Sequence, residues 1–415
     1  MSQKPPYVVR PSTAVITRGY DPMLSVGSVR PAVFRSSTYV FRSPESAERA
    51  FAIALGKLQP TDGEQVDLIY SRVSHPNAEI LEDQVAPLEP GAEAAAVFNS
   101  GMAAISTLLL TFCPPGSACA YTKPLYGGTQ MFLDQMLAKR GVTCAGIRAG
   151  DTDELRRTIA ETENLRVVFI ETPSNPTVTM TDIKAAVEAA RALPEPPLVV
   201  VDNTFLGPVF QHPLSLGADL SVYSATKYLA GFSDMLGGVV LGRSPELVNL
   251  LRGTRVMLGN IIQPDECWLL NSRLPTVELR MNRQSKNADR VVAALAEHPK
   301  VLEVLHPSTF EDPEQVRIRD AQTNYGGAMI SLRVKGGKSG AFEFLRRVRI
   351  AHDAVSLGGM ETLVCHPATT THSEMSPEEL KEFGVGDDLV RISIGIEDWR
   401  DLVEDFKQAL DGLPD

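Results

Sequence analysis

Residues 94–98 read AAAVF, and the same kind of short apolar run returns four times, as SACAY (117–121), TCAGI (143–147), RVVFI (166–170) and PLVVV (197–201). The segments between these runs have apolar residues at helical spacing, as in GMAAISTLLLTF (101–112), TQMFLDQMLAKR (129–140) and DIKAAVEAARAL (182–193). Short apolar runs that alternate with helices are typical of a parallel sheet joined by crossover helices. We therefore predict an α/β fold with a mostly parallel sheet between two layers of helices.

The sequence on either side of this region predicts two further units. After the strand-like runs ADLSVYS (218–224) and GGVVLG (237–242), residues 268–298 predict a long helix that leads into a smaller α+β domain with strands at 328–334, 351–357 and 390–396. Before residue 66, scattered prolines leave one helical stretch, Pro44–Leu58. We expect an N-terminal arm (1–65) that packs on a neighbouring subunit, an α/β domain (66–270) and a C-terminal α+β domain (271–415).

Composition and charge exclude several classes of protein. The 415 residues are 43% hydrophobic and 22% charged, as in ordinary globular domains, so bulk disorder is excluded. The net charge of −11 and the lack of long Lys/Arg runs argue against nucleic acid as a partner. The start MSQKPPYVVR has no signal-peptide pattern, and no apolar run approaches the roughly 20 residues of a membrane span, so we expect a soluble cytoplasmic protein.

Motifs for several common activities are missing from the sequence. The five cysteines include no CxxC pair, so we expect reduced thiols rather than disulfides or a zinc site. There is no GxGxxG, no P-loop, no HExxH and no GxSxG. These absences argue against nucleotide binding, a metal site and a serine hydrolase.

Lys227 is the candidate for covalent chemistry. It stands in SVYSATKY (221–228), at the end of a predicted strand, among hydroxyl-bearing and small residues. A lysine that forms a Schiff base must lose part of its hydration, so that a useful fraction of its amine is neutral. Ser224 and Thr226 can hold a phosphate beside it. The alternative is that Lys227 is an ordinary exposed lysine in a loop. The neighbouring motifs favour a Schiff-base lysine over this alternative.

Three further strand ends carry polar groups. Asp202 follows VVV (199–201) and could pair with a protonated pyridine nitrogen, although such an aspartate is more often a cap. In FNSGM (98–102) a strand turns into a helix, whose free backbone N–H groups can bind an anion or simply be capped. In ETPSNP (171–176) the Asn175 amide could reach a ring hydroxyl.

Together these segments resemble, in order and approximate spacing, the Cys/Met-metabolism family of pyridoxal-phosphate (PLP) enzymes of fold type I. The family includes cystathionine gamma-synthase, the cystathionine lyases, methionine gamma-lyase and O-acetylhomoserine sulfhydrylase. SATKY (224–228) and VDNT (201–204) carry the resemblance most specifically. It extends over essentially the whole chain, from IYSR (69–72) to VRISIG (390–395).

The resemblance implies a role for each candidate site residue. Lys227 would bind PLP as a Schiff base and move protons, Asp202 would hold the pyridine nitrogen, and Tyr126 would stack on the ring and donate a proton to the leaving group. The phosphate would be held by Ser100, Gly101, Met102, Ser224 and Thr226, together with Tyr70 and Arg72 of a neighbouring subunit. The substrate would be held by Arg391, Asn175, Ser356 and Glu361, with the arginine on the α-carboxylate and Glu361 near the distal end.

Shared active sites of this kind require at least a dimer. The resemblance implies a homo-oligomer, a tetramer built from dimers, and it accounts for the N-terminal arm.

Three departures from the family pattern bear on the substrate. His75-Pro76-Asn77 stands where Asn-Pro-Thr is usual, Phe232 stands where many relatives carry histidine, and the segment Lys57–Leu68 is longer than usual. All three are expected either at the entrance of the site or just behind the residues that contact the substrate.

The resemblance implies γ-elimination or γ-replacement on a γ-substituted four-carbon L-amino acid. Cystathionine, an activated homoserine ester and canavanine all remain open as substrates. Gly128 stands where methionine gamma-lyases typically carry cysteine, which argues against that activity, while SLGGMETL (356–363) resembles the gamma-synthase and gamma-lyase branches. The alternatives are a methionine gamma-lyase, a β-lyase, which would release pyruvate instead of 2-oxobutyrate, and a silent PLP-binding protein, which would have lost Lys227, Tyr126 or Arg391.

Overall fold

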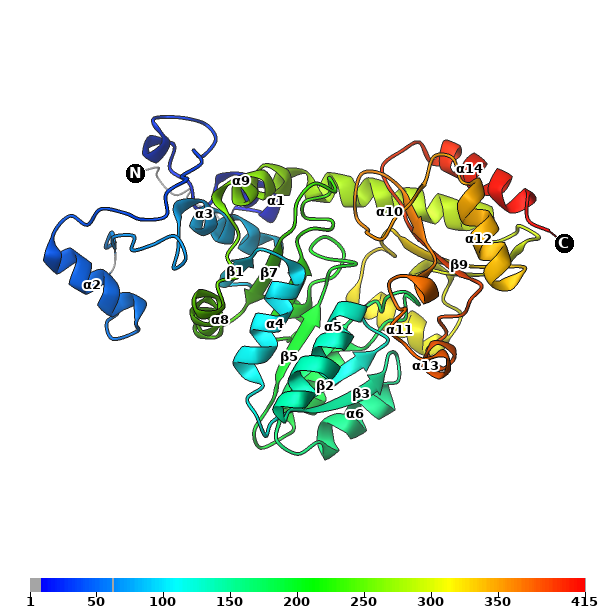
Figure 1. The fold of residues 1–415 in the computed structure, drawn as a ribbon, viewed down its shortest axis with the longest axis horizontal. Coiled ribbons are helices and arrows are strands. Elements are labelled where there is room, and N and C mark those ends of the chain that lie inside the picture. The colour runs from blue at the N-terminus through cyan, green and yellow to red at the C-terminus, as the bar shows by residue number, and fades with distance from the viewer. Residues whose placement is uncertain (1–8, 62, 415) are drawn as a thin grey trace.

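A computed structural model describes residues 9–61 and 63–414 (Figure 1), so the first eight residues of the expected arm lie outside the described residues. The larger sheet contains seven strands: β1 (Ala94–Phe98), β2 (Ala118–Lys123), β3 (Thr143–Arg148), β4 (Leu165–Glu171), β5 (Leu198–Asp202), β6 (Leu220–Ser224) and β7 (Gly238–Gly242). Their order is β1-β7-β6-β5-β4-β2-β3. The five apolar runs that predicted the fold are therefore confirmed as β1 to β5.

The larger sheet is parallel except at β7, which lies between β1 and β6 and is antiparallel to both. Helices cover both of its faces. One apolar cluster packs α4 (Gly101–Phe112) and α8 (Pro245–Leu258) on one face, and a second packs α6 (Thr152–Glu161) and α7 (Ile183–Arg191) on the other. This confirms the predicted α/β class, with a mixed rather than wholly parallel sheet.

The C-terminal part of the chain forms a second, smaller sheet, as expected, but with five strands instead of three, and the strand expected over 351–357 is a strand only at His352–Asp353. Its order is β10-β11-β12-β9-β8, and it is mostly antiparallel. The strands are β8 (Val301–Leu305), β9 (Met329–Val334), β10 (His352–Asp353), β11 (Leu363–Cys365) and β12 (Leu389–Ser393). The remaining α-helices are α1 (Pro11–Thr17), α2 (Pro44–Ala54), α3 (Pro76–Val85), α5 (Gly127–Phe132), α9 (Pro264–Arg273), α10 (Val277–Leu295), α11 (Pro313–Gln322), α12 (Gly337–Arg347), α13 (Pro377–Glu382) and α14 (Trp399–Asp411).

Two expected helices differ from a single regular α-helix. The long helix expected over 268–298 is wrong as one element, because α9 ends at Arg273 and a 3₁₀ turn over Leu274–Thr276 separates it from α10. Pro275 has no N–H for the helical hydrogen bond, which accounts for the break. The stretch 129–140 is helical throughout, but it passes from α5 into a π turn (Leu133–Leu137) and a 3₁₀ turn (Ala138–Arg140).

The arm carries apolar side chains that the rest of the chain does not cover. In Figure 1 helix α2 stands well away from both sheets. Val26 and Val40 are 100% and 95% exposed, and Met23 and Leu24 are also exposed. An apolar surface of this kind is typical of a segment that packs on another chain. The domain boundaries stay predictions, and the one expected after residue 270 falls inside α9.

No helix within the described part of the chain is both long and apolar enough to cross a membrane.

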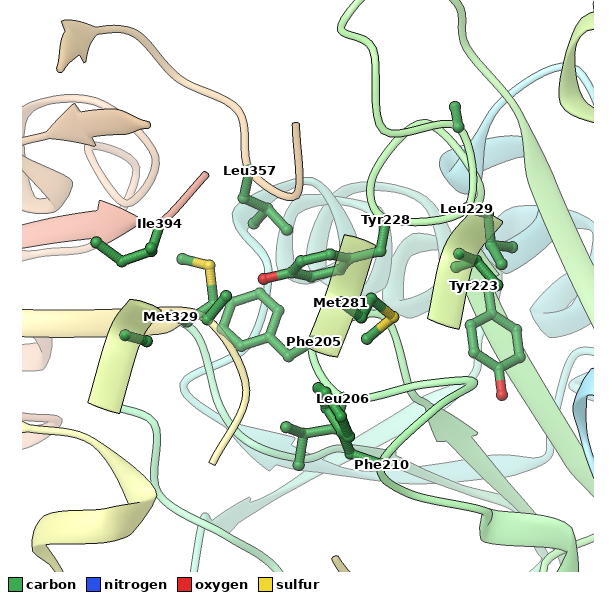
Figure 2. Packing of buried hydrophobic residues seen from close by; sticks show 14 of the residues in the cluster. Phe205, Leu206, Phe210, Tyr223, Tyr228, Leu229, Met281, Met329, Leu357 and Ile394 are labelled. Atoms are coloured by element: carbon green, nitrogen blue, oxygen red, sulfur yellow. The ribbon is translucent and has the colours of Figure 1, made fainter. Parts of the chain in front are cut away.

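The α/β part and the C-terminal part of the chain pack together beside the loop that follows β6. Tyr228, the neighbour of Lys227, is buried among Phe205, Leu357 and Met329 (Figure 2). Phe205 follows β5 of the larger sheet, whereas Leu357 and Met329 belong to the C-terminal part. The peptide that carries Lys227 is thus anchored where the two parts of the chain pack together.

Candidate active site

A cavity of about 180 Å³ opens at the carboxyl ends of β4, β5 and β6, beside the first turn of α4. Most of the residues expected in the site line it: Ser100, Gly101, Met102, Tyr126, Asn175, Asp202, Ser224, Thr226 and Lys227. Other lining residues were not predicted as part of the site: Ile105, Glu171, Pro173, Thr204, Phe205, Leu236 and Leu357. Segments distant in sequence therefore converge on one cavity.

The Lys227 amine donates a hydrogen bond to the hydroxyl of Ser356, with Nζ and Oγ 3.0 Å apart. Burial, with a smaller contribution from the charge of Arg391, lowers the pKa of Lys227 to about 8. A lysine in this environment has a substantial neutral fraction near neutral pH, as a nucleophile or base requires.

The loop that carries Lys227 is fixed by the C-terminal part of the chain. The backbone N–H of Met360 donates to the Gly231 carbonyl at 3.0 Å. Gly358 has a φ of +77°, and a Cβ placed there would lie 2.7 Å from the backbone nitrogen of Tyr228. This close backbone contact sets the position of the loop from which Lys227 projects.

Arg391 is held in a buried position at the edge of the site. Its Nη1 donates to Asn175 Oδ1 at 3.0 Å, and its Nη2 donates to the Ser356 carbonyl at 3.1 Å. His372 Nε2 lies 2.9 Å from the Asn175 carbonyl. Burial lowers the pKa of His372 to about 4, so the ring is neutral near pH 7 and donates its Nε2 proton to that carbonyl.

Asp202 is a buried carboxylate at the end of β5. It accepts hydrogen bonds from the backbone N–H and the hydroxyl of Thr204, at 3.0 and 2.6 Å. Burial raises the pKa of Asp202. A cationic N–H placed against this carboxylate would offset that effect and favour its ionised form.

The first turn of α4 forms a cradle against β6. Ser100 caps the helix by accepting a hydrogen bond from the Ala103 N–H at 3.0 Å. A Cβ on Gly101 would lie 2.9 Å from both Cβ and Oγ of Ser224, so only glycine allows this approach. Helix N–H groups and hydroxyls gathered in this way suit an anion such as a phosphate.

Tyr126 lies at the mouth of the cavity and is 44% exposed. Its backbone N–H donates to Glu171 Oε2 at 2.9 Å. Its ring leans over Gly128, where an added Cβ would lie 2.6 Å from Tyr126 Cε1. The residue at position 128 therefore controls where this ring can lie.

Five predicted residues do not line this cavity in the single chain. Ser356 and Arg391 lie beside it, where they contact the lining residues Lys227 and Asn175. Tyr70 and Arg72 line a separate cavity of about 600 Å³, where Arg72 Nη1 donates to the Val256 carbonyl at 3.0 Å. Glu361 accepts a hydrogen bond from the Ser233 hydroxyl.

Two of the departures from the family pattern have structural roles. His75 is buried and caps α3 by accepting the Ala78 N–H at 3.2 Å. The Phe232 ring lies beneath the guanidinium groups of Arg273 and Arg280, with Cζ 4.6 and 5.7 Å from its centroid. Arg280 also donates to the carbonyls of residues 228 and 229, just after Lys227.

Glu171, Thr204 and His372 contact predicted site residues and were missed as members of the site. Glu171 and Thr204 stand in ETPSNP and VDNT, so closeness to the motifs was the available signal. His372 had no such signal, because it meets Asn175 across nearly 200 residues of chain.

The residues present fit the expected PLP. The cradle at Gly101 and Ser224 would hold the phosphate, Asp202 would hold the ring nitrogen, and the Lys227 amine would meet the carbonyl carbon. Tyr126, at the cavity mouth, would lie against the ring. Within the described residues no group of three or more His, Cys, Asp or Glu side chains is arranged to hold a metal ion.

Comparison with known proteins is consistent with this geometry. A family model described as Cys/Met metabolism PLP-dependent enzyme matches residues 12–411. The chain is 38% identical over 401 residues to an L-methionine gamma-lyase of Pseudomonas putida, covering 96% of each chain. It is 36% identical over 355 residues to a cystathionine gamma-lyase of Bacillus subtilis, covering 86% of this chain and 92% of the relative. A solved cystathionine gamma-synthase of Xanthomonas oryzae, in complex with cystathionine, matches with a TM-score of 0.88 at 31% identity over 98% of each chain.

Proposed function

Since the chain belongs to the Cys/Met metabolism family of PLP-dependent enzymes, we propose that it eliminates or replaces the γ substituent of a four-carbon L-amino acid, with Lys227 as the base. The family membership makes it a PLP-dependent enzyme of the lyase and gamma-synthase group. The choice of substrate, the roles of individual residues and the oligomeric state are our proposals.

The observation that carries the proposal is the environment of Lys227. Its amine lies 3.0 Å from Ser356 Oγ, and its pKa is lowered to about 8, chiefly by burial. Asp202 and the cradle at Gly101 line the same cavity. A lysine that only contributes to solubility lies on the surface with its amine hydrated, whereas the Lys227 amine is partly buried beside these groups, as is typical of a functional site.

Arg391 binds and orients the substrate in this proposal. Its guanidinium offers a planar, bidentate surface to the α-carboxylate, and Asn175 and the Ser356 carbonyl hold it in place. Orientation of this kind sets the Cα–H bond toward the Lys227 amine.

Lys227 and Tyr126 move the protons. PLP, when bound, accepts the electron pair released at the substrate's α carbon. Lys227 Nζ takes the α proton, gives it up to the group that has accepted the electron pair, and, neutral again, takes a β proton. Ser356 Oγ orients the amine between these steps. The Tyr126 phenol, at the mouth of the cavity, donates a proton to the departing γ group.

The substrates that we propose are cystathionine, an activated homoserine ester and canavanine. Relatives named for three different activities match this chain at 34–38% identity, so similarity alone does not choose among them. Glu361 is the residue that we propose to favour a cationic distal group. Methionine and a β-lyase reaction are the alternatives, and Gly128 argues against the first.

The test is incubation of the purified protein with a panel of γ-substituted L-amino acids, followed by assays for 2-oxobutyrate, homoserine and transfer products. We expect 2-oxobutyrate or a γ-replacement product from at least one of the three proposed substrates. Pyruvate from cystathionine would indicate a β-lyase instead. Borohydride reduction should attach PLP to Lys227, and attachment to another lysine would contradict the proposal.

A further inference from the structure

Glu171 is a buried carboxylate in the site that the proposed mechanism does not use. It is the last residue of β4, is 5% exposed, and lies opposite Asp202 in the register of β4 and β5. It also lines the cavity that contains Lys227. A buried carboxylate is costly unless its oxygens are hydrogen-bonded, so its partners are informative.

Each oxygen of Glu171 accepts one backbone N–H. Oε2 accepts from Tyr126 at 2.9 Å, and Oε1 accepts from Asn175 at 3.0 Å. These two residues come from different loops, one after β2 and one after β4. A single side chain thus connects the loop of the aromatic ring to the loop that holds Arg391.

The connection continues beyond Asn175 to the proposed substrate clamp. Asn175 Oδ1 accepts from Arg391 Nη1 at 3.0 Å, so a shift of the Asn175 backbone would move the guanidinium. Catalysis is sensitive to small displacements, because reacting groups must be held close to their productive geometry. Glu171 therefore connects Tyr126 to the Arg391–Asn175 pair, and both must be correctly placed relative to a bound substrate.

We propose that Glu171 is a positioning residue that holds Tyr126 in register with the Arg391–Asn175 clamp. This inference rests on the proposed function and adds a residue to it. The chemistry of glutamate suits the task, because an ionised carboxylate offers an acceptor on both of its terminal atoms. Burial and the charge of Asp202 raise the pKa of Glu171 to about 8, and the two backbone N–H donors act in the opposite direction because they favour the ionised form. A glutamine has the same shape but only one acceptor oxygen. It can accept one of the two backbone N–H groups, and the other N–H would then face the glutamine NH₂ group, which is also a donor.

The test compares Glu171→Gln and Glu171→Asp with Glu89→Gln as the matched control. Glu89 is also a buried carboxylate, 1% exposed, which accepts the Leu214 N–H at 3.1 Å and the Tyr223 hydroxyl, but it does not line the cavity. Glu171→Asp keeps the carboxyl group and shortens its reach, so it should also fail to bridge the two loops.

We expect both Glu171 variants to lose roughly tenfold or more in kcat/KM, with KM raised through Arg391 and kcat lowered through Tyr126. The visible circular dichroism of bound PLP should also change, because it reports the ring's contact with Tyr126. Glu89→Gln should change thermal stability alone. Kinetics and dichroism within about twofold of the unaltered protein in both Glu171 variants would overturn the proposal. An equal kinetic loss in Glu89→Gln would overturn it too.

Hydrogen exchange on the unaltered PLP-bound protein provides a second measurement if neither Glu171 variant folds. The amides of Tyr126 and Asn175 should be strongly protected, and rapid exchange at either amide would overturn the proposal. An unaltered protein that binds no PLP contradicts the proposed function as well, so the two failures are distinguishable.

Discussion

Lys227 should take up PLP with a pH dependence set by its lowered pKa. The neutral amine is the reactive form, and its pKa is about 8 instead of the usual 10.5. Uptake by the apoprotein should therefore rise with pH, reach half of its plateau near pH 8 and level off below pH 10. Stopped-flow absorbance after mixing apoprotein with PLP measures this rate. N-acetyl-lysine run in parallel corrects for the titration of PLP itself.

The charge of Arg391 also contributes to this shift. Arg391→Ala should therefore move the plateau to higher pH. A rate for the unaltered protein that still climbs at pH 10 would contradict the prediction.

Gly128 should not tolerate the cysteine that is typical of methionine gamma-lyases. A Cβ at this position would lie 2.6 Å from Tyr126 Cε1, so Gly128→Cys must displace the ring. We expect kcat/KM to fall about ten- to a hundredfold without a gain in methionine cleavage. Gly128→Ala isolates the steric effect and should lose a similar factor, as steady-state kinetics with both substrates would measure. A Cys variant that gains methionine cleavage and keeps its other activity would contradict this.

Substitution of Glu361 tests whether this residue attracts a positively charged group at the distal end of the substrate. If it attracts a cationic group, Glu361→Gln should weaken kcat/KM for cystathionine and canavanine about ten- to a hundredfold and leave O-acetylhomoserine nearly unchanged. Ser233→Ala removes the hydroxyl that donates to this carboxylate and is the control. Equal losses on charged and neutral substrates would mean instead that Glu361 orders the loop after Ser356.

At the scale of the element, the first turn of α4 should be intolerant of any side chain. Gly101→Ala places a Cβ 2.9 Å from Ser224 and should weaken PLP binding by about tenfold or more, since the cradle must open. Gly253→Ala, in the middle of α8 with open space around it, is the matched control and should be neutral or stabilising by up to about 1 kcal/mol. Equilibrium PLP titration and thermal unfolding distinguish the two. Equal PLP affinities in the two variants would contradict a phosphate site at this turn.

Elements with strong local signals were predictable from the sequence, and those defined by distant contacts were not. The runs behind β1, β2, β4 and β5 are buried on both faces, so they read as continuous apolar segments. β3 lies at the edge of the sheet and is largely exposed, and its run TCAGI is the least apolar of the five. β8 was missed because its Leu302 and Glu303 are exposed at the edge of the second sheet. β11 has only three residues, which is too short for a periodic pattern.

The same distinction applies to the site. Lys227 and Asp202 stand in compact motifs at strand ends and could be found from the sequence. Their convergence with Arg391 required the resemblance to a family, because the arginine lies on β12 of the second sheet. Glu171 stands within the ETPSNP motif, but the two backbone N–H groups that donate to it come from separate loops, which are brought together only in the folded chain.

At the scale of the whole molecule, Tyr70 and Arg72 should serve a neighbouring subunit. They line a cavity separate from that of Lys227, and the arm before them exposes apolar side chains. Mixing inactive Lys227→Ala with inactive Arg72→Ala should restore part of the activity, since a hybrid dimer then contains one complete site. Activity assays and native mass spectrometry of the mixture measure this. Demonstrated subunit exchange without recovered activity would contradict the shared site.

The contact between Gly358 and the peptide of Tyr228 has a consequence for how this enzyme could diversify. A side chain at position 358 would be strained and would collide with the peptide of Tyr228, so we expect substitutions there to be selected against and the position of Lys227 to be preserved. Val355, three residues earlier on the same segment and next to Ser356, is 61% exposed and packs on little. We therefore expect that mutations at one end of this segment can change the substrate preference while the other end keeps Lys227 in place.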